Sequence, residues 1–226
     1  SMSYMEDHVL AYKAPLYGRR TAQMKILPFD FDECCTYLSG SSEEDKAYIY
    51  GIVGGTPQYL LQINDKLSVE DNIKNTYLNP MSFLYEEPLN LLKQEVREPA
   101  IYNAIITAVA TGYSRMSEIS AKVGESTTVC SGYLKNLIDL GIIRKETPYG
   151  EKASKKTIYS IEDNMFYFWY RFVPDNASAI ARGAENLVYK KVKSELNDYM
   201  GRVFEEICKQ YLWKLLLEGQ MPIEFT

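Results

Sequence analysis

Apolar and polar residues follow a helical period over most of the chain, and the pattern is clearest between Pro99 and Ile161. Apolar side chains at helical spacing indicate three consecutive helices, the third ending at Gly141, and two β-prone runs follow them. In chain order these elements contain Ile101–Val109, Met116–Val123, Ser126–Leu140, Ile142–Thr147 and Thr157–Ile161. Three helices followed by a two-stranded hairpin are typical of a winged helix-turn-helix.

The segment before this unit, Phe29–Val96, has a helical and acidic pattern. Asp30 or Asp32 is suited to cap a first helix, and Ser68 another. Gly54-Gly55-Thr56-Pro57 stops one helix and starts the next, and it could also serve as a hinge. Several short helices with tight connections predict a small helical bundle. The fold class expected for the whole chain is therefore mainly α with a small β wing.

The most aromatic run of the chain, Asn164–Val173, follows the hairpin. Exposed aromatic rings could stack on unpaired bases, but a helix buried against the winged unit explains the run more simply. Beyond it the pattern predicts two more helices, Leu187–Leu196 and Tyr199–Leu217. The second should bury one apolar side, formed by Phe204, Ile207, Cys208, Tyr211, Leu212 and Leu215.

Composition excludes several classes of protein. Hydrophobic residues make up 46% and charged residues 24% of the 226 residues, as in ordinary globular proteins. The sequence contains no apolar run of about 18 residues and no signal-peptide pattern at its start, so we expect a cytoplasmic protein without membrane spans. Four cysteines without metal spacing suggest free thiols. The net charge of −5 argues against a basic nucleic-acid coat.

The winged unit offers polar and basic side chains that could contact DNA. On its third helix the outward-facing positions are expected to include Asn136 and Asp139, of which Asp139 would repel phosphate. Between Arg144 and Lys156 the wing carries five basic and two acidic residues. DNA contact and use of the unit as an internal protein–protein module both remain open. The candidate nucleic-acid-binding residues are Thr127, Thr128, Ser131, Lys135, Arg144, Lys145, Lys152, Lys155 and Lys156.

Other candidate residues lie outside the winged unit. Arg19 and Arg20, in a loop with Pro and Gly, suit phosphate or carboxylate recognition, although a structural salt-bridging pair is the alternative. Glu205 and Glu206 could serve a metal, or could simply favour a helix start. The sequence has no Gly-x-x-x-x-Gly-Lys-Ser/Thr loop, and its one histidine, His8, has no partner that suggests a catalytic triad or zinc site. No complete catalytic constellation is present.

Several motifs occur together in an order that resembles the archaeal-type P-loop ATPase family of the AAA+ group, whose members carry a C-terminal restriction-endonuclease-like domain. The resemblance covers essentially the whole chain and includes the winged unit. Its other motifs are Pro15-Leu-Tyr-Gly-Arg-Arg-Thr21, Gly54-Gly-Thr-Pro-Gln-Tyr-Leu60, Leu84-Tyr-Glu-Glu87, Glu95-Val-Arg-Glu-Pro99, Phe166-Tyr-Phe-Trp-Tyr-Arg-Phe172 and Gly201-Arg-Val-Phe-Glu205.

The resemblance implies a layout in which residues 1–28 are the tail of the nucleotide-binding core, 29–97 a helical lid, 98–173 the winged helix and 174–226 the start of the nuclease-like domain. Arg19 and Arg20 would then reach nucleotide phosphates, and Glu205 would match the acid of the first nuclease-fold helix. ATP and Mg would bind in the longer parent protein, with no cofactor expected in this fragment.

Both ends of the chain look cut, so the expected partners include the ATPase core and C-terminal domain of the same polypeptide. DNA is a possible partner through the winged helix, and the oligomeric state is left open. Two other interpretations remain, a winged-helix DNA-binding regulator and a scaffold whose winged unit only docks neighbouring domains.

Overall fold

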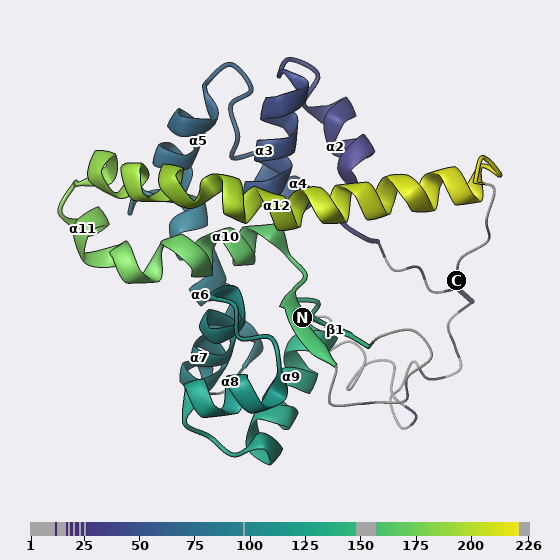
Figure 1. Cartoon of the computed structure of the whole chain (residues 1–226), viewed down its shortest axis with the longest axis vertical. Helices are drawn as coiled ribbons and strands as arrows, with labels where there is room; N and C mark the ends of the chain where they lie inside the picture. The colour runs from purple at the N-terminus through teal and green to yellow at the C-terminus, as the bar shows by residue number, and fades with distance from the viewer. Residues whose placement is uncertain are drawn as a thin grey trace. The chain divides into compact units, whose positions relative to one another are not determined.

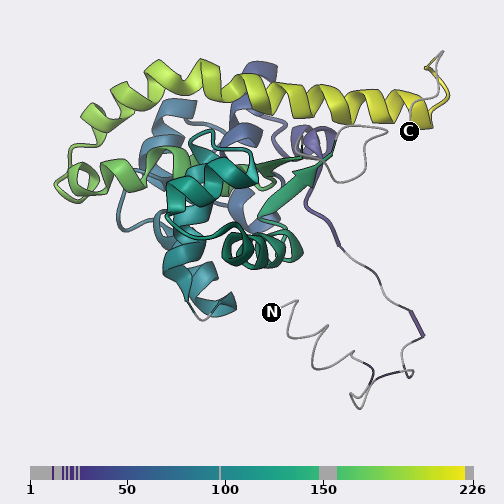
Figure 2. The same ribbon diagram turned by 60° about the horizontal axis from the view of Figure 1, so that its bottom comes forward.

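The computed structural model describes residues 12, 17, 19, 21, 22, 24, 26–96, 98–147 and 157–221. This part of the chain is mostly helical and contains one two-stranded antiparallel sheet (Figures 1 and 2). The expected fold class, mainly α with a small β wing, is confirmed. Of the helices described, none combines the length and apolar character that crossing a membrane requires. Arg20, Lys152, Lys155 and Lys156 lie outside the described residues.

The chain divides into two compact units that are each built from two separate stretches. One unit combines Ser1–Leu27 with Glu86–Arg171, and the other combines Pro28–Tyr85 with Phe172–Thr226. Helix α6 (Phe83–Glu95) contains the change from one unit to the other. The predicted bundle therefore shares a unit with the C-terminal helices, while the domain limits expected from the sequence stay predictions.

In the unit that combines Pro28–Tyr85 with Phe172–Thr226, short helices pack along the long helix α12 (Glu185–Leu217). The hydroxyl of Tyr199 donates to the carbonyl of Gly51 at 2.5 Å, and the side chain of Gln210 accepts from the amide of Phe31 at 2.9 Å. These bonds join α12 to two of the short helices. The remaining elements are α2 (Phe31–Tyr37), α3 (Glu43–Val53), α4 (Pro57–Leu60), α5 (Val69–Thr76), η2 (Pro174–Asn176) and α11 (Ala177–Ala181).

The N-termini of the short helices follow the predicted caps. Asp30 caps α2 by accepting from the amide of Glu33, whose carboxylate accepts from the amide of Asp30. Ser42 and Ser68 cap α3 and α5 in the same way, each accepting from the amide three residues later. Such bonds satisfy amides that the helix itself cannot pair.

The prediction of two helices between Leu187 and Leu217 was wrong, because α12 is one continuous helix of 33 residues. Asn197 and Asp198, which lie between the two expected helices, are exposed and stay within the helix. Gly201 also stays helical. The buried residues continue across this region at spacings of three or four, so one stripe holds the whole helix: Val188, Val192, Leu196, Tyr199, Val203 and Ile207.

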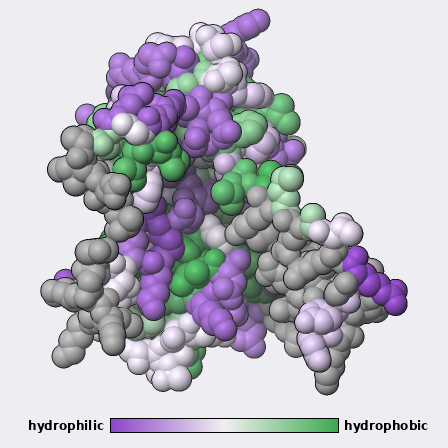
Figure 3. Space-filling view, turned by 90° about the vertical axis from the view of Figure 1, so that its right-hand side faces the viewer, coloured by the Kyte–Doolittle hydropathy of each residue, from purple (hydrophilic) through white to green (hydrophobic). Residues whose placement is uncertain are grey.

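The prediction that an apolar side is buried near the end of α12 is also largely wrong. Ile207 is buried, but Phe204 is 60% and Tyr211 57% exposed, and Leu212 and Cys208 are exposed as well. The space-filling view toward the side where α12 ends shows hydrophobic residues at the surface among hydrophilic ones (Figure 3). The last buried residue of α12 is Ile207, and the helix continues to Leu217 without a further buried residue.

The winged unit contains the predicted elements in the predicted order. Helix α7 packs on α8, α9 and β2, and α9 packs on β1. The strands pair in antiparallel fashion with Ile143 opposite Ile161 and Glu146 opposite Ile158. The elements are α7 (Pro99–Ala110), α8 (Met116–Val123), α9 (Thr127–Asp139), β1 (Ile143–Glu146), β2 (Ile158–Ile161) and α10 (Asn164–Phe172).

The aromatic run forms α10, and most of its large side chains are buried. Trp169 is 5% exposed, and Tyr170 bonds through its hydroxyl to Asn103 of α7. Phe166 and Tyr170 stack with ring centroids 6.1 Å apart. The interpretation as a buried helix is therefore confirmed, and these rings do not form an exposed surface for bases.

Candidate functional site

Helix α9 separates its buried and exposed residues as the sequence predicted. Cys130, Leu134 and Leu137 are buried, and the hydroxyl of Ser126 caps the helix by accepting from the amide of Val129 at 3.3 Å. The role of the outer face in binding nucleic acid stays a prediction. Its exposed residues include Thr127, Thr128, Ser131, Lys135, Asn136 and Asp139.

The described part of the wing carries less available positive charge than its sequence suggests. Arg144 lies 2.8 Å from a carboxylate oxygen of Glu146 and 3.6 Å from one of Glu162, and it donates to the hydroxyl of Ser160. Only Lys145 is an exposed basic residue on the strands themselves. A phosphate approaching Arg144 would have to compete with two carboxylates.

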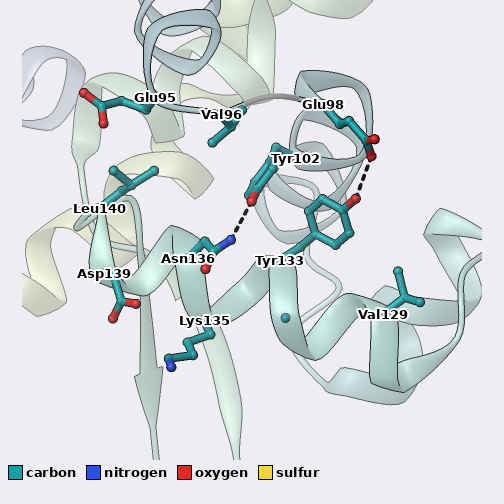
Figure 4. Close-up of a pocket in the computed structure, with 11 residues that line it drawn as sticks. Glu95, Val96, Glu98, Tyr102, Val129, Tyr133, Lys135, Asn136, Asp139 and Leu140 are labelled. Carbon is teal, nitrogen blue, oxygen red and sulfur yellow. Dashed lines mark hydrogen bonds between the residues drawn. The ribbon is translucent and has the colours of Figure 1, made fainter. Parts of the chain in front are cut away.

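A hollow of about 700 Å³ lies between the end of α6, the start of α7 and the exposed side of α9 (Figure 4). It falls within the size range of ligand sites, roughly 300–1,000 Å³. All of its lining belongs to the compact unit that contains the winged helix: Glu95, Val96, Glu98, Tyr102, Val129, Gly132, Tyr133, Lys135, Asn136, Asp139 and Leu140.

Two hydrogen bonds organise the lining of this hollow. The hydroxyl of Tyr133 donates to the carboxylate of Glu98 at 3.1 Å, and the side-chain amide of Asn136 donates to the hydroxyl of Tyr102 at 2.7 Å (Figure 4). The two tyrosine rings meet edge to face with centroids 4.6 Å apart. Desolvation, together with the bond to Glu98, raises the pKa of the Tyr133 phenol. The phenol therefore stays protonated and keeps donating near neutral pH.

Sequence reasoning had assigned no role to Glu98, Tyr102 or Tyr133. Tyr102 has the spacing of a core residue, and Glu98 stands beside the helix-starting Pro99. The one available signal was the 31-residue separation of two tyrosines on adjacent predicted helices, which does not by itself predict contact. The hollow appears only when α7 and α9 are packed.

The remaining candidate residues are not brought together into one site. Arg19 is exposed, and Glu205 is exposed on α12 with Lys209 at 3.3 Å. Within the described ranges, no three His, Cys, Asp or Glu side chains cluster as metal ligands would. The roles of Arg19 and Glu205 stay predictions.

The Gly54–Pro57 turn, considered both as a hinge and as a helix stop, makes a close backbone contact. The amide of Phe29 donates to the carbonyl of Gly55 at 2.9 Å, and a Cβ on Gly55 would lie 1.8 Å from the carbonyl oxygen of Phe29. This contact requires glycine, and it ties the turn to the start of α2. It favours a fixed helix stop over a hinge.

Comparison with known proteins gives two matches. A family described as archaeal and bacterial proteins of unknown function matches residues 169–226. An uncharacterized protein of Methanocaldococcus jannaschii is 36% identical over all 226 residues. The chain spans about half, 51%, of the length of that relative. No solved structure matches. The chain is thus similar to an archaeal protein about twice its length, along its whole sequence.

Proposed function

We propose that this chain is the lid and winged-helix portion of an ATP-driven P-loop ATPase, and that it couples the nucleotide state to a partner. The observation that carries the proposal is the order of the elements. A unit of short helices, Pro28–Tyr85, precedes a winged helix-turn-helix, and both follow the Arg19–Arg20 loop in sequence. This is the layout that the family resemblance implies.

The similarity to a relative of about twice the length is consistent with this proposal, because the phosphate loop and the magnesium-binding acids would lie in the additional sequence. Phosphoryl transfer needs these groups to hold the nucleotide and its metal. The chain alone would then neither hydrolyse ATP nor cut DNA. Its part would be to move with the nucleotide state and to present the winged unit.

A longer polypeptide that carries the phosphate loop provides the test. Replacing Arg19 and Arg20 by alanine should lower ATP turnover at least tenfold, because arginines at the phosphates stabilise charge in the transition state. Arg182→Ala is the control, since this exposed residue follows α11 and belongs to the other compact unit. Unchanged turnover in the Arg19/Arg20 variant would reject the assignment of these arginines.

A second candidate function is DNA binding by the winged helix. The observation that favours it is the exposed polar face of α9, where Thr127, Thr128 and Ser131 are accessible at the start of the helix. In gel-shift titrations with duplex DNA, replacing these three residues by alanine should weaken binding, and the affinity should fall steeply with salt. Absence of DNA binding at low salt would exclude this candidate.

A further inference from the structure

Glu98 and Asp139 are two of the three carboxylates that line the hollow beside α9. Glu98 occupies the N-cap position of α7, where a carboxylate would normally accept bonds from the first amides, yet it makes no cap bond. It accepts instead from Tyr133, across the hollow. Asp139 is the last residue of α9, at the negative end of the helix dipole, where an acid is unfavourable.

Neither carboxylate has a positive partner in the described part of the chain. Lys135 stands one helical turn before Asp139, but no ion pair joins the two, and among the described residues no lysine or arginine pairs with Glu98. In Figure 4, Glu98 and Asp139 lie at opposite ends of the lining, with Tyr133 and Asn136 between them. The lining contains three carboxylates, Glu95, Glu98 and Asp139, and one lysine, Lys135, so the hollow carries a net negative charge.

The surface between the two acids is aromatic and apolar. Tyr102 and Tyr133 contribute their rings, and Val96, Val129 and Leu140 contribute aliphatic groups. A guanidinium or ammonium group is attracted to tyrosine ring faces and to carboxylates, while its methylene stem packs on apolar groups. A DNA phosphate would meet repulsion from the same carboxylates.

We propose that this hollow binds a basic peptide segment of a partner protein, with an arginine or lysine side chain seated against Tyr133 and paired with Glu98 or Asp139. The negative charge and the size of the hollow favour a basic peptide over nucleic acid. The proposal concerns a different ligand from the nucleotide, so it stands or falls independently of ATP binding by a longer polypeptide.

The test uses the whole chain and a fluorescein-labelled Gly-Ser-Arg-Gly-Arg-Ser-Gly peptide, with binding followed by fluorescence anisotropy. A matched peptide with citrulline in place of arginine keeps the shape and removes the charge. The arginine peptide should bind, and the citrulline peptide should bind much more weakly. Glu98→Gln and Asp139→Asn should each weaken binding about fivefold, as expected for a partly exposed charge pair.

Two further variants test whether the peptide binds in the hollow or is attracted non-specifically to the acidic protein. Tyr133→Leu should weaken binding by a similar factor through loss of the ring. Glu125→Gln, an exposed acid just before α9 that does not line the hollow, should leave binding unchanged. Circular dichroism on each variant checks that the fold is kept.

The proposal is overturned if both peptides bind equally, if neither binds, or if Glu125→Gln weakens binding as much as Glu98→Gln. It is also overturned if duplex DNA binds and Glu98→Gln with Asp139→Asn weakens that binding, because removing carboxylates from a face that repels phosphate should leave DNA affinity unchanged or higher.

Discussion

At Gly55 two stretches of backbone come so close that a side chain does not fit. A Cβ there would lie 1.8 Å from the carbonyl oxygen of Phe29, which is backbone and cannot rotate away. Gly55→Ala should therefore destabilise the protein by roughly 1–3 kcal/mol, as overpacking does.

Gly201 provides the matched control for this substitution. It lies inside α12, and an added Cβ would meet nothing within 4 Å. Gly201→Ala should stabilise the protein by about 0.5–1 kcal/mol, since alanine favours a helix interior. Urea unfolding followed by circular dichroism measures both changes. Equal midpoints for the two variants would show that the Gly55 contact is not as described.

A second residue-scale prediction concerns Asp163, which caps α10 by accepting from the amides of Met165 and Phe166. Burial raises the pKa of its carboxyl to about 6, although the two amide bonds oppose this shift. Because the folded state holds this proton more tightly than the unfolded chain does, the contribution to stability is complete at low pH and is lost as the pH rises through about 6.

The free energy of unfolding should thus increase as the pH falls from about 7 toward 4. Asp163→Asn should flatten this dependence, and Glu87, whose carboxyl pKa burial also raises, should leave a smaller residual slope. Denaturant titrations across this range test the prediction. An undiminished slope in the variant would show that other groups cause it.

Among the elements, the winged helix-turn-helix could be predicted because each signal is local. Ser126 caps α9, Gly141 ends the turn after it, and a β-prone run indicates each strand. The outer face of α9 could be predicted for the same reason, since helical spacing fixes which residues share a side. The hollow could not, because it depends on how α7 and α9 pack.

For α12, local signals gave the wrong answer. The sequence predicted one helix ending at Leu196 and another beginning at Tyr199, whereas the buried stripe from Val188 to Ile207 continues through this region. Tertiary packing on the short helices outweighs the local preferences. The spacing of the apolar residues Val188, Val192, Leu196, Tyr199, Val203 and Ile207 by three or four positions is the sequence signal that predicts a single helix.

Removing a hydrogen bond between α12 and α3 tests this packing. The Tyr199 hydroxyl donates to the Gly51 carbonyl within α3, and both residues are buried. Tyr199→Phe removes the hydroxyl that makes this bond and should lower the free energy of unfolding by about 1–2 kcal/mol. Tyr211→Phe, on the exposed side of the same helix, should change it by less than about 0.5 kcal/mol. If both variants match the unmodified protein in thermal unfolding, α12 does not pack on α3 in this way.

For the whole molecule, the chain order of the elements differs from their grouping in space. Residues 28–85 and 172–226 form one compact unit although the winged helix separates them in sequence. Periodicity reports only neighbours along the chain, so it cannot reveal such a pairing. The same limit applies to the candidate residues. Helical spacing shows which residues share the exposed face of α9, but it does not show that Glu98 at the N-cap of α7 contacts Tyr133 of α9.

We propose that this chain belongs to an ATP-driven protein but does not hold the nucleotide by itself. The most direct measurement is ATP binding by calorimetry, made on this chain and on the full-length Methanocaldococcus jannaschii relative that contains a similar stretch. We expect the relative to bind ATP with magnesium and this chain to show no binding. Tight ATP binding by this chain alone, or none by the relative, would contradict it.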